Sequence, residues 1–311
     1  MIWLQILAYT AIVLFILITS LKFVRYLTMP MHLRWELYPV PHEKHKAEYG
    51  GSYYEETEWW KKPIETTTVG ELKETLLEML FIKRLFKYNR SLWYTSFPFH
   101  GGIYLMLLWF LLIFTSAISS VLGLMTLESV THSAANIVGP IGMVSLTIGC
   151  LGLLLKRMAD KNLRKYSSIS DYINLLFILA VVLTGIIAWR IDMNFSIAKS
   201  FATSLVTFTP LSELPSIVTL HVVLLSALVA YIPFTKMSHY VAKYFTYHQV
   251  LWDDHPNLAN TPIRNKVKEV LAYRLTWSAP HIRKNLTWAE EATTIEPVLE
   301  LKAMAERREK R

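Results

Sequence analysis

The chain of 311 residues contains a single cysteine, Cys150, and this scarcity limits the chemistry that the chain can perform. One cysteine excludes an intramolecular disulfide, an iron–sulfur cluster held by cysteines of this chain and a covalent CxxCH haem site. The sequence also lacks the GxGxxG and GxxxxGK loops that cradle phosphates. Electron chemistry in this chain would therefore use noncovalently bound cofactors.

Charge is missing from several long stretches of the chain, which is 53% hydrophobic and has a mean hydropathy of +0.31. Five apolar segments are long enough to cross a hydrocarbon core of about 30 Å. No basic residue precedes the first segment, so a cleaved signal peptide is not expected. The sequence predicts an all-α integral membrane protein, a bundle of five transmembrane helices. Their expected ranges are 1–21, 97–122, 133–156, 171–190 and 214–240.

Basic residues are unevenly divided among the connections, and this predicts the orientation. Lys22 and Arg25 follow the first segment, whereas the link 125–133 has no Lys or Arg. The link between the third and fourth segments carries five basic residues: Lys156, Arg157, Lys161, Arg164 and Lys165. We expect the N-terminus outside and the C-terminus in the cytoplasm, with the protein in the inner (cytoplasmic) membrane. The net charge of +8 then lies mostly on the cytoplasmic face, where it faces anionic lipid, and no basic stripe favours nucleic acid.

Two stretches are expected in the cytoplasm. The loop 22–96 contains leucines at helical spacing, Leu72, Leu76 and Leu80, which predict an amphipathic helix on the membrane surface. The tail 241–311 is broken by prolines and looks helical only at 265–274 and 296–310. Neither stretch has the apolar periodicity of an independent domain, so both are interpreted as docking surfaces for a partner.

Two histidines of the last apolar segment, His221 and His239, lie eighteen residues apart. In a continuous helix this spacing is five turns, so both imidazoles would lie on one face, about 27 Å apart along the axis. Histidines at membrane depth favour a functional interpretation. The pattern indicates metal centres, most simply haem, at two depths of the membrane.

His100 opens the second span on the side where His239 closes the fifth, so these two can meet and give bis-imidazole ligation of a b-type haem. The alternative for each is an interfacial histidine that binds headgroup water. His221 is either a ligand or a structural histidine. Its candidate partner, His132, precedes the third expected span and is otherwise an interfacial loop residue.

Several motifs resemble a family of five-helix membrane cytochromes. They are FPFHGG around His100, GLLLKR, SDYINLL, SLVTFTP and the run LHVVLLSALVAYIPFTKMSH, which holds both His221 and His239. The resemblance is to the gamma subunit of respiratory nitrate reductase. It extends to membrane cytochromes of sulfate-reducer complexes (DsrM-like and TmcC-like) and to the membrane cytochrome of heterodisulfide reductase. It covers roughly residues 95–240, which it identifies as a four-helix haem-binding core at 97–240.

The resemblance implies a ligand set. His100 and His239 would hold the inner haem b, and His221 one side of an outer haem b. The family's second outer ligand lies ten residues after the first helix-two histidine, where this chain has Phe110, which cannot ligate iron. His132 supplies the missing ligand, or His221 holds a five-coordinate haem, or the outer haem is missing. His132 also falls where the nitrate reductase gamma chain has a lysine beside the quinone site, so it is alternatively a quinone ligand.

The function implied by the resemblance is electron transfer in anaerobic respiration. Quinol, expected to be menaquinol, would give two electrons to haem near the outer surface and release protons there. The electrons would leave through a cytoplasmic heterodisulfide-reductase-like iron–sulfur subunit, and the reverse direction uses the same parts. A periplasmic multihaem cytochrome c is a further candidate partner. The rival functions are a membrane anchor without redox activity and a transporter with histidine relays. The charge-free spans argue against the transporter.

Overall fold

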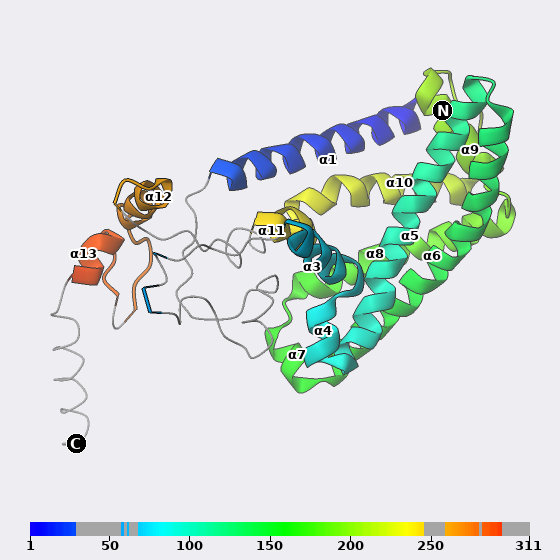
Figure 1. Cartoon of the computed structure of the whole chain (residues 1–311). Coiled ribbons are helices and arrows are strands. Elements are labelled where there is room, and N and C mark those ends of the chain that lie inside the picture. The colour runs from blue at the N-terminus through cyan, green and yellow to red at the C-terminus, as the bar shows by residue number, and fades with distance from the viewer. Residues whose placement is uncertain (29–56, 59–60, 62–67, 246–258, 280–281, 294–311) are drawn as a thin grey trace. The chain divides into compact units, whose positions relative to one another are not determined.

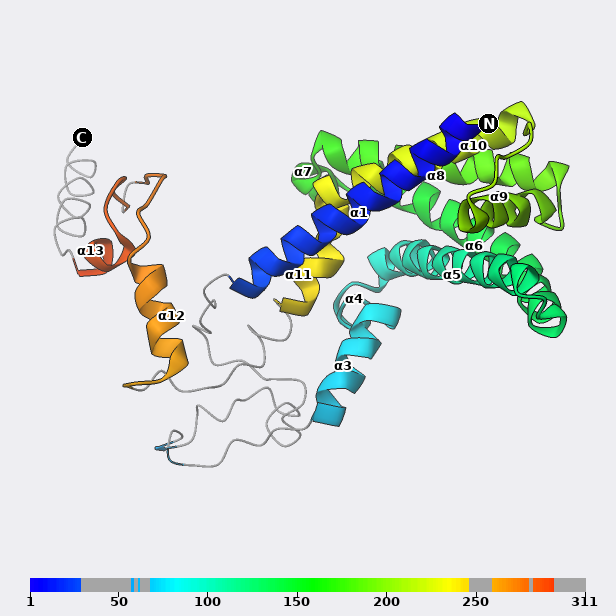
Figure 2. The same cartoon turned by 90° about the horizontal axis from the view of Figure 1, so that it is seen from above.

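The computed structural model describes residues 1–28, 57–58, 61, 68–245, 259–279 and 282–293 (Figures 1 and 2). Every regular element among these residues is a helix, apart from two isolated β-bridges in the tail. The chain divides into two compact units. The first is Met1–Lys22 with Val69–Tyr240, and the second is Phe23–Thr68 with Val241–Arg311. The helix expected at 296–310 lies outside the described residues.

Five helices are long and apolar enough to cross a membrane, which confirms the predicted all-helical, five-span architecture in the described part of the chain. They are α1 (Ile2–Thr28), α5 (Arg90–Val121), α6 (Met125–Ala159), α8 (Ile169–Ile191) and α10 (Ser216–Tyr231), the last continued by a 3-10 turn to Phe234. The orientation of the termini stays a prediction.

Two spans begin earlier than the sequence predicts, α5 after a side-chain cap and α6 after a tight turn. The Asn89 side chain accepts a hydrogen bond from the backbone N–H of Leu92 at 3.1 Å, so α5 begins at Arg90 and includes Pro98. Gly123, with φ +73°, makes a tight turn after α5, and α6 begins two residues later instead of at 133. Glycine adopts this left-handed conformation at no steric cost, which allows the short turn. The link expected at 125–133 is therefore part of α6.

The last span differs most from expectation. A single helix over 214–240 is wrong, because α10 ends at Tyr231 and is followed by two 3-10 turns, η3 (Ile232–Phe234) and η4 (Lys236–Ser238). Pro233 has no N–H for a helical hydrogen bond. Thr235 is extended, with φ −116° and ψ 177°, and caps η4 through its side chain. A new helix, α11 (His239–Phe245), begins at the histidine itself. The eighteen-residue spacing is therefore not five turns of one helix.

Shorter helices complete the two units. The expected amphipathic segment is split into α3 (Thr68–Phe81) and α4 (Lys83–Tyr88) at Ile82, whose φ is 51°. The sequence did not predict α7 (Lys161–Tyr166), α9 (Ser196–Thr207) or α13 (Trp288–Thr293). The tail helix α12 (Pro262–Leu271) begins and ends three residues before the predicted 265–274.

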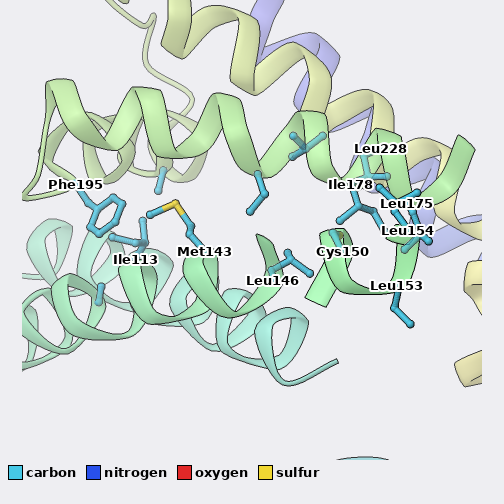
Figure 3. Close-up of a cluster of buried hydrophobic side chains, with 14 of the residues drawn as sticks. Ile113, Met143, Leu146, Cys150, Leu153, Leu154, Leu175, Ile178, Phe195 and Leu228 are labelled. Carbon is cyan, nitrogen blue, oxygen red and sulfur yellow. The ribbon is translucent and has the colours of Figure 1, made fainter. Parts of the chain in front are cut away.

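The core of the first unit lies where α5, α6 and α8 meet (Figure 3). Met143, Leu146 and Cys150 from α6 pack there against Ile113 of α5 and Ile178 of α8. Glycines bring α5 and α6 into backbone contact. A Cβ added to Gly149 would lie 2.3 Å from the Phe99 nitrogen, and one added to Gly102 would lie 2.5 Å from the Leu146 nitrogen. Small residues are the usual means of close helix packing in membranes.

Candidate functional site

The structure brings together the two histidines that the sequence predicts as a pair. His100, on α5, and His239, at the start of α11, have ring centroids 6.4 Å apart and ring planes inclined by 83°. His100 is half-buried, whereas His239 is exposed. Both rings therefore lie at the margin of the apolar core rather than inside it. Residues 139 positions apart in the sequence meet here, and the second of them lies directly after the break that follows α10.

Each ring of the pair is oriented by a backbone carbonyl. The His100 Nδ1 lies 2.8 Å from the Ser96 carbonyl oxygen, and the His239 Nδ1 lies 3.0 Å from the Lys236 carbonyl oxygen. A carbonyl oxygen only accepts, so Nδ1 carries the proton in both rings and donates it. This tautomer leaves the lone pair on Nε2. Metal-bound histidines commonly use this arrangement, which fixes the ring and raises its basicity.

The separation of the rings suits bis-imidazole ligation. Two metal–nitrogen bonds of about 2 Å, with about 1 Å from each Nε2 to its ring centre, give roughly 6 Å between centroids. The observed 6.4 Å is close to this value. No group of three or more His, Cys, Asp or Glu side chains gathers in the described part of the chain. Two imidazoles alone are the ligand set of a b-type haem, so these residues fit that cofactor.

His221 lies elsewhere, between α10 and α8. Its Nδ1 is 3.2 Å from the Thr184 Oγ1, and a Cβ added to Gly185 would approach the ring to 3.0 Å. Thr184 and Gly185 thus orient a half-buried ring against α8. Phe110 stands where the family has its second outer haem ligand. It is 42% exposed and packs against Phe114, with ring centroids 4.5 Å apart. The role of His221 as an outer haem ligand stays a prediction.

His132 lines a cleft of about 450 Å³ whose walls are mostly hydroxylic. Its Nδ1 is buried and has no hydrogen-bond partner, which is costly unless a ligand or water binds there. No hydrogen bond or ring contact among the described residues joins His132 to His221, so their pairing also stays a prediction. The other polar residues of the cleft are Ser120, Ser196, Lys199, Ser200, Thr203, Ser204, Thr209 and Ser212.

Sequence reasoning missed the charged pair at this cleft. Lys199 of α9 forms an ion pair with Glu128 of α6, and their side chains are 21% and 26% exposed. The signal was present, because polar residues at positions 196, 199, 200 and 203 recur at helical spacing. The stretch lies between two long apolar runs, where hydropathy alone predicts only a link.

The fold and the histidine pair define a multi-pass helical membrane protein with two facing imidazoles, one from the second span and one from the segment that follows the fifth. A family model of the nitrate reductase gamma subunit matches residues 85–252, and the chain belongs to that family. This confirms the resemblance in the sequence motifs.

A curated relative from Archaeoglobus profundus is described as an Hdr-like menaquinol oxidoreductase cytochrome b-like subunit. It is 28% identical over 192 residues, which are 55% of this chain and 56% of that protein. The match thus spans only about half the length of the relative. No solved structure matches the chain.

Proposed function

We propose that this protein is the membrane cytochrome b subunit of a respiratory complex. It transfers electrons through haem b between the membrane quinone pool and a cytoplasmic iron–sulfur partner. The observation that carries the proposal is the facing pair His100 and His239, with both Nδ1 atoms bonded to backbone carbonyls. Family membership supports the same function.

The ligands of the proposed haem site and the carbonyls behind them have different roles. His100 and His239 would hold the haem through Nε2, while the Ser96 and Lys236 carbonyls fix the direction of the rings. When bound, haem supplies reversible one-electron chemistry. The protein supplies the ligands, the apolar surroundings of α5 and α6, and the spacing between the rings.

The cleft at His132 is the proposed quinone site. A quinone headgroup needs hydrogen-bond donors at its carbonyl oxygens, and the buried Nδ1 and the surrounding hydroxyls offer them. Outer haem ligation by His132 with His221 is the competing assignment. The relative's description names menaquinol, which makes menaquinone the proposed substrate here. Its Hdr-like description supports a heterodisulfide-reductase-like partner. We propose the loop 22–96 and the tail 241–311 as the docking surfaces for that partner. A periplasmic multihaem cytochrome c has no support in the comparisons.

A pyridine haemochrome assay of the purified protein tests the proposal. We expect at least one haem b per chain, with that haem lost in His100→Ala and in His239→Ala. Leu111→Ala is the control, because Leu111 is an exposed residue of the same helix as His100 and is 63% exposed. Wild-type protein without haem would contradict the proposed function and leave the membrane anchor as the better explanation.

His132→Ala separates the two assignments of that residue in the same assay. If His132 binds quinone, we expect the haem content to be unchanged and the Michaelis constant for menaquinol to rise. If it ligates an outer haem, the haem content of a two-haem protein falls to one. Either result decides the role of the cleft, since both quantities come from one preparation.

A further inference from the structure

The segment that carries His239 is held at three points after α10 ends. The Thr235 hydroxyl accepts a hydrogen bond from the Met237 N–H at 3.2 Å. The Ser238 hydroxyl accepts one from Lys22 Nζ at 2.8 Å and donates one to the Thr235 carbonyl at 2.8 Å. The third point is Lys236, which reaches across to the N-terminus of α8. A ligand on a broken helix depends on such contacts, because the backbone of Thr235 is bonded to Ile232 and Ser238 in two short 3-10 turns rather than in a continuous α-helix.

Lys236 binds a fixed acceptor. Its Nζ lies 3.0 Å from Ser168 Oγ and 3.3 and 3.4 Å from the two carboxylate oxygens of Asp171. Asp171 is itself held by the capping box of α8, where it accepts hydrogen bonds from the backbone N–H and the hydroxyl of Ser168, both at 2.8 Å. The carboxylate side chain is only 17% exposed, so its position is well defined.

The same lysine orients the imidazole through its backbone. The carbonyl oxygen of Lys236 is the acceptor for His239 Nδ1 at 3.0 Å. One residue therefore joins the capped end of α8, through its side chain, to the ring that faces His100, through its carbonyl. These two contacts form a chain that runs from Asp171 through Lys236 to His239.

We propose that Lys236 and Asp171 are positioning residues that aim the His239 ring at the haem iron and set the strength of its ligation. This inference rests on the proposed haem role of His100 and His239. Lys236 is 67% exposed, and an exposed ion pair stabilises a fold little. Its effect is therefore expected in the properties of the ligand rather than in the stability of the bundle. Partners of this kind, one step behind a ligand, typically change metal affinity by about 10- to 100-fold.

The test compares Lys236→Met, Asp171→Asn and Lys236→Arg in the purified protein. A carbonyl bonded to Nδ1 makes the ring a stronger donor and favours oxidised iron. Loss of the anchor is expected to raise the midpoint potential of the inner haem in both of the first two variants. We expect a change of about tenfold in the reduction equilibrium, which is about 59 mV for one electron. Both variants should also change the g values in the electron paramagnetic resonance spectrum, and Lys236→Arg should restore both properties.

The direction of the shift excludes a simple charge effect. Removing the positive charge of Lys236 would by itself lower the potential, whereas removing the negative charge of Asp171 would raise it. Shifts of the same sign in the midpoint potentials of Lys236→Met and Asp171→Asn therefore indicate a common anchor. In the variant that carries both substitutions, the two shifts should not add. Lys161→Met is the control, since Lys161 is an exposed basic residue at the start of α7.

Opposite shifts, or wild-type potentials and g values in Lys236→Met, would overturn the inference. Asp171 also caps α8, so Asp171→Asn could fail to fold. In that case the result for Lys236→Met alone decides the test. The haem content of the wild type is measured in the same samples. Wild-type protein without haem contradicts the proposed function, whereas wild-type protein with haem and an unaffected Lys236→Met contradicts only the positioning role.

Discussion

At the scale of single residues, the histidine pair shows what residue spacing can and cannot reveal. The pairing of His100 with His239 follows from their places at the same end of two apolar segments. The carbonyls that orient the rings do not follow from it, because the Lys236 carbonyl is available only where the chain leaves the helix. Backbone geometry at a helix break thus contributes to the site as much as the histidines themselves.

The Glu128–Lys199 ion pair gives a prediction at the same scale. Lys199 lines the hydroxylic cleft that contains His132. If this cleft is the proposed quinone site, oxidation of a quinol there would release two protons beside the pair. Lys199→Met leaves the partly buried carboxylate of Glu128 without its partner. We expect quinol oxidation to slow by up to about tenfold, the equivalent of about 1.4 kcal/mol in the barrier. Stability should fall by about 1 kcal/mol or less, because the pair is partly exposed.

The measurement for this pair is steady-state quinol oxidation as a function of pH, with thermal unfolding of the same samples. Glu128→Gln should reproduce the slower rate. Glu213→Gln is a matched control, since Glu213 is an exposed acid in the link before α10. An unchanged rate in both Lys199→Met and Glu128→Gln would remove the pair from the path of the protons.

At the scale of elements, the contact between α5 and α6 depends on positions without a side chain. A Cβ at Gly149 would lie 2.4 Å from the Phe99 Cα, next to the residue that carries the proposed ligand. Gly149→Ala must therefore push α5 away from α6. We expect a loss of about 1–3 kcal/mol in stability, the usual cost of overpacking. The shift should also lower haem retention through His100.

Gly101→Ala is the matched control for this prediction, because a Cβ at Gly101 meets nothing within 4 Å. Thermal unfolding and haem content of both variants in the same detergent give the comparison. Equal behaviour of the two variants would mean that the close approach at Gly149 does not position His100.

The elements also show where sequence reasoning reaches its limit. Long apolar runs gave the number of spans, because the bilayer requires about 20 apolar residues in each helix. The same reasoning missed the end of α10, since Pro233 within an apolar run does not reveal whether a membrane helix kinks or stops. It also missed α9, whose polar residues face the cleft instead of lipid. A hydropathy pattern takes a short polar stretch between two apolar runs as a surface link, and here such a stretch forms a helix that lines a cleft.

At the scale of the whole molecule, the direction of electron flow depends on the orientation of the chain, which so far rests on the basic residues alone. The structure supplies two suitable positions for a test. Met125, at the start of α6, is 79% exposed and predicted to lie outside, whereas Tyr166, at the end of α7, is 82% exposed and predicted to lie in the cytoplasm. Cys150 is buried, so the native thiol gives little background.

Labelling of intact cells with a membrane-impermeant maleimide tests this orientation. We expect Met125→Cys to react in intact cells and Tyr166→Cys to react only after the membrane is permeabilised. This outcome places the His132 cleft on the outer side and the His100–His239 pair on the cytoplasmic side. His132 lies near Met125 at the start of α6, whereas His100 follows Phe99, which packs against Gly149 in the half of α6 that leads to α7 and Tyr166. The reverse pattern would invert the topology, and quinol oxidation at the cleft would then release its protons into the cytoplasm.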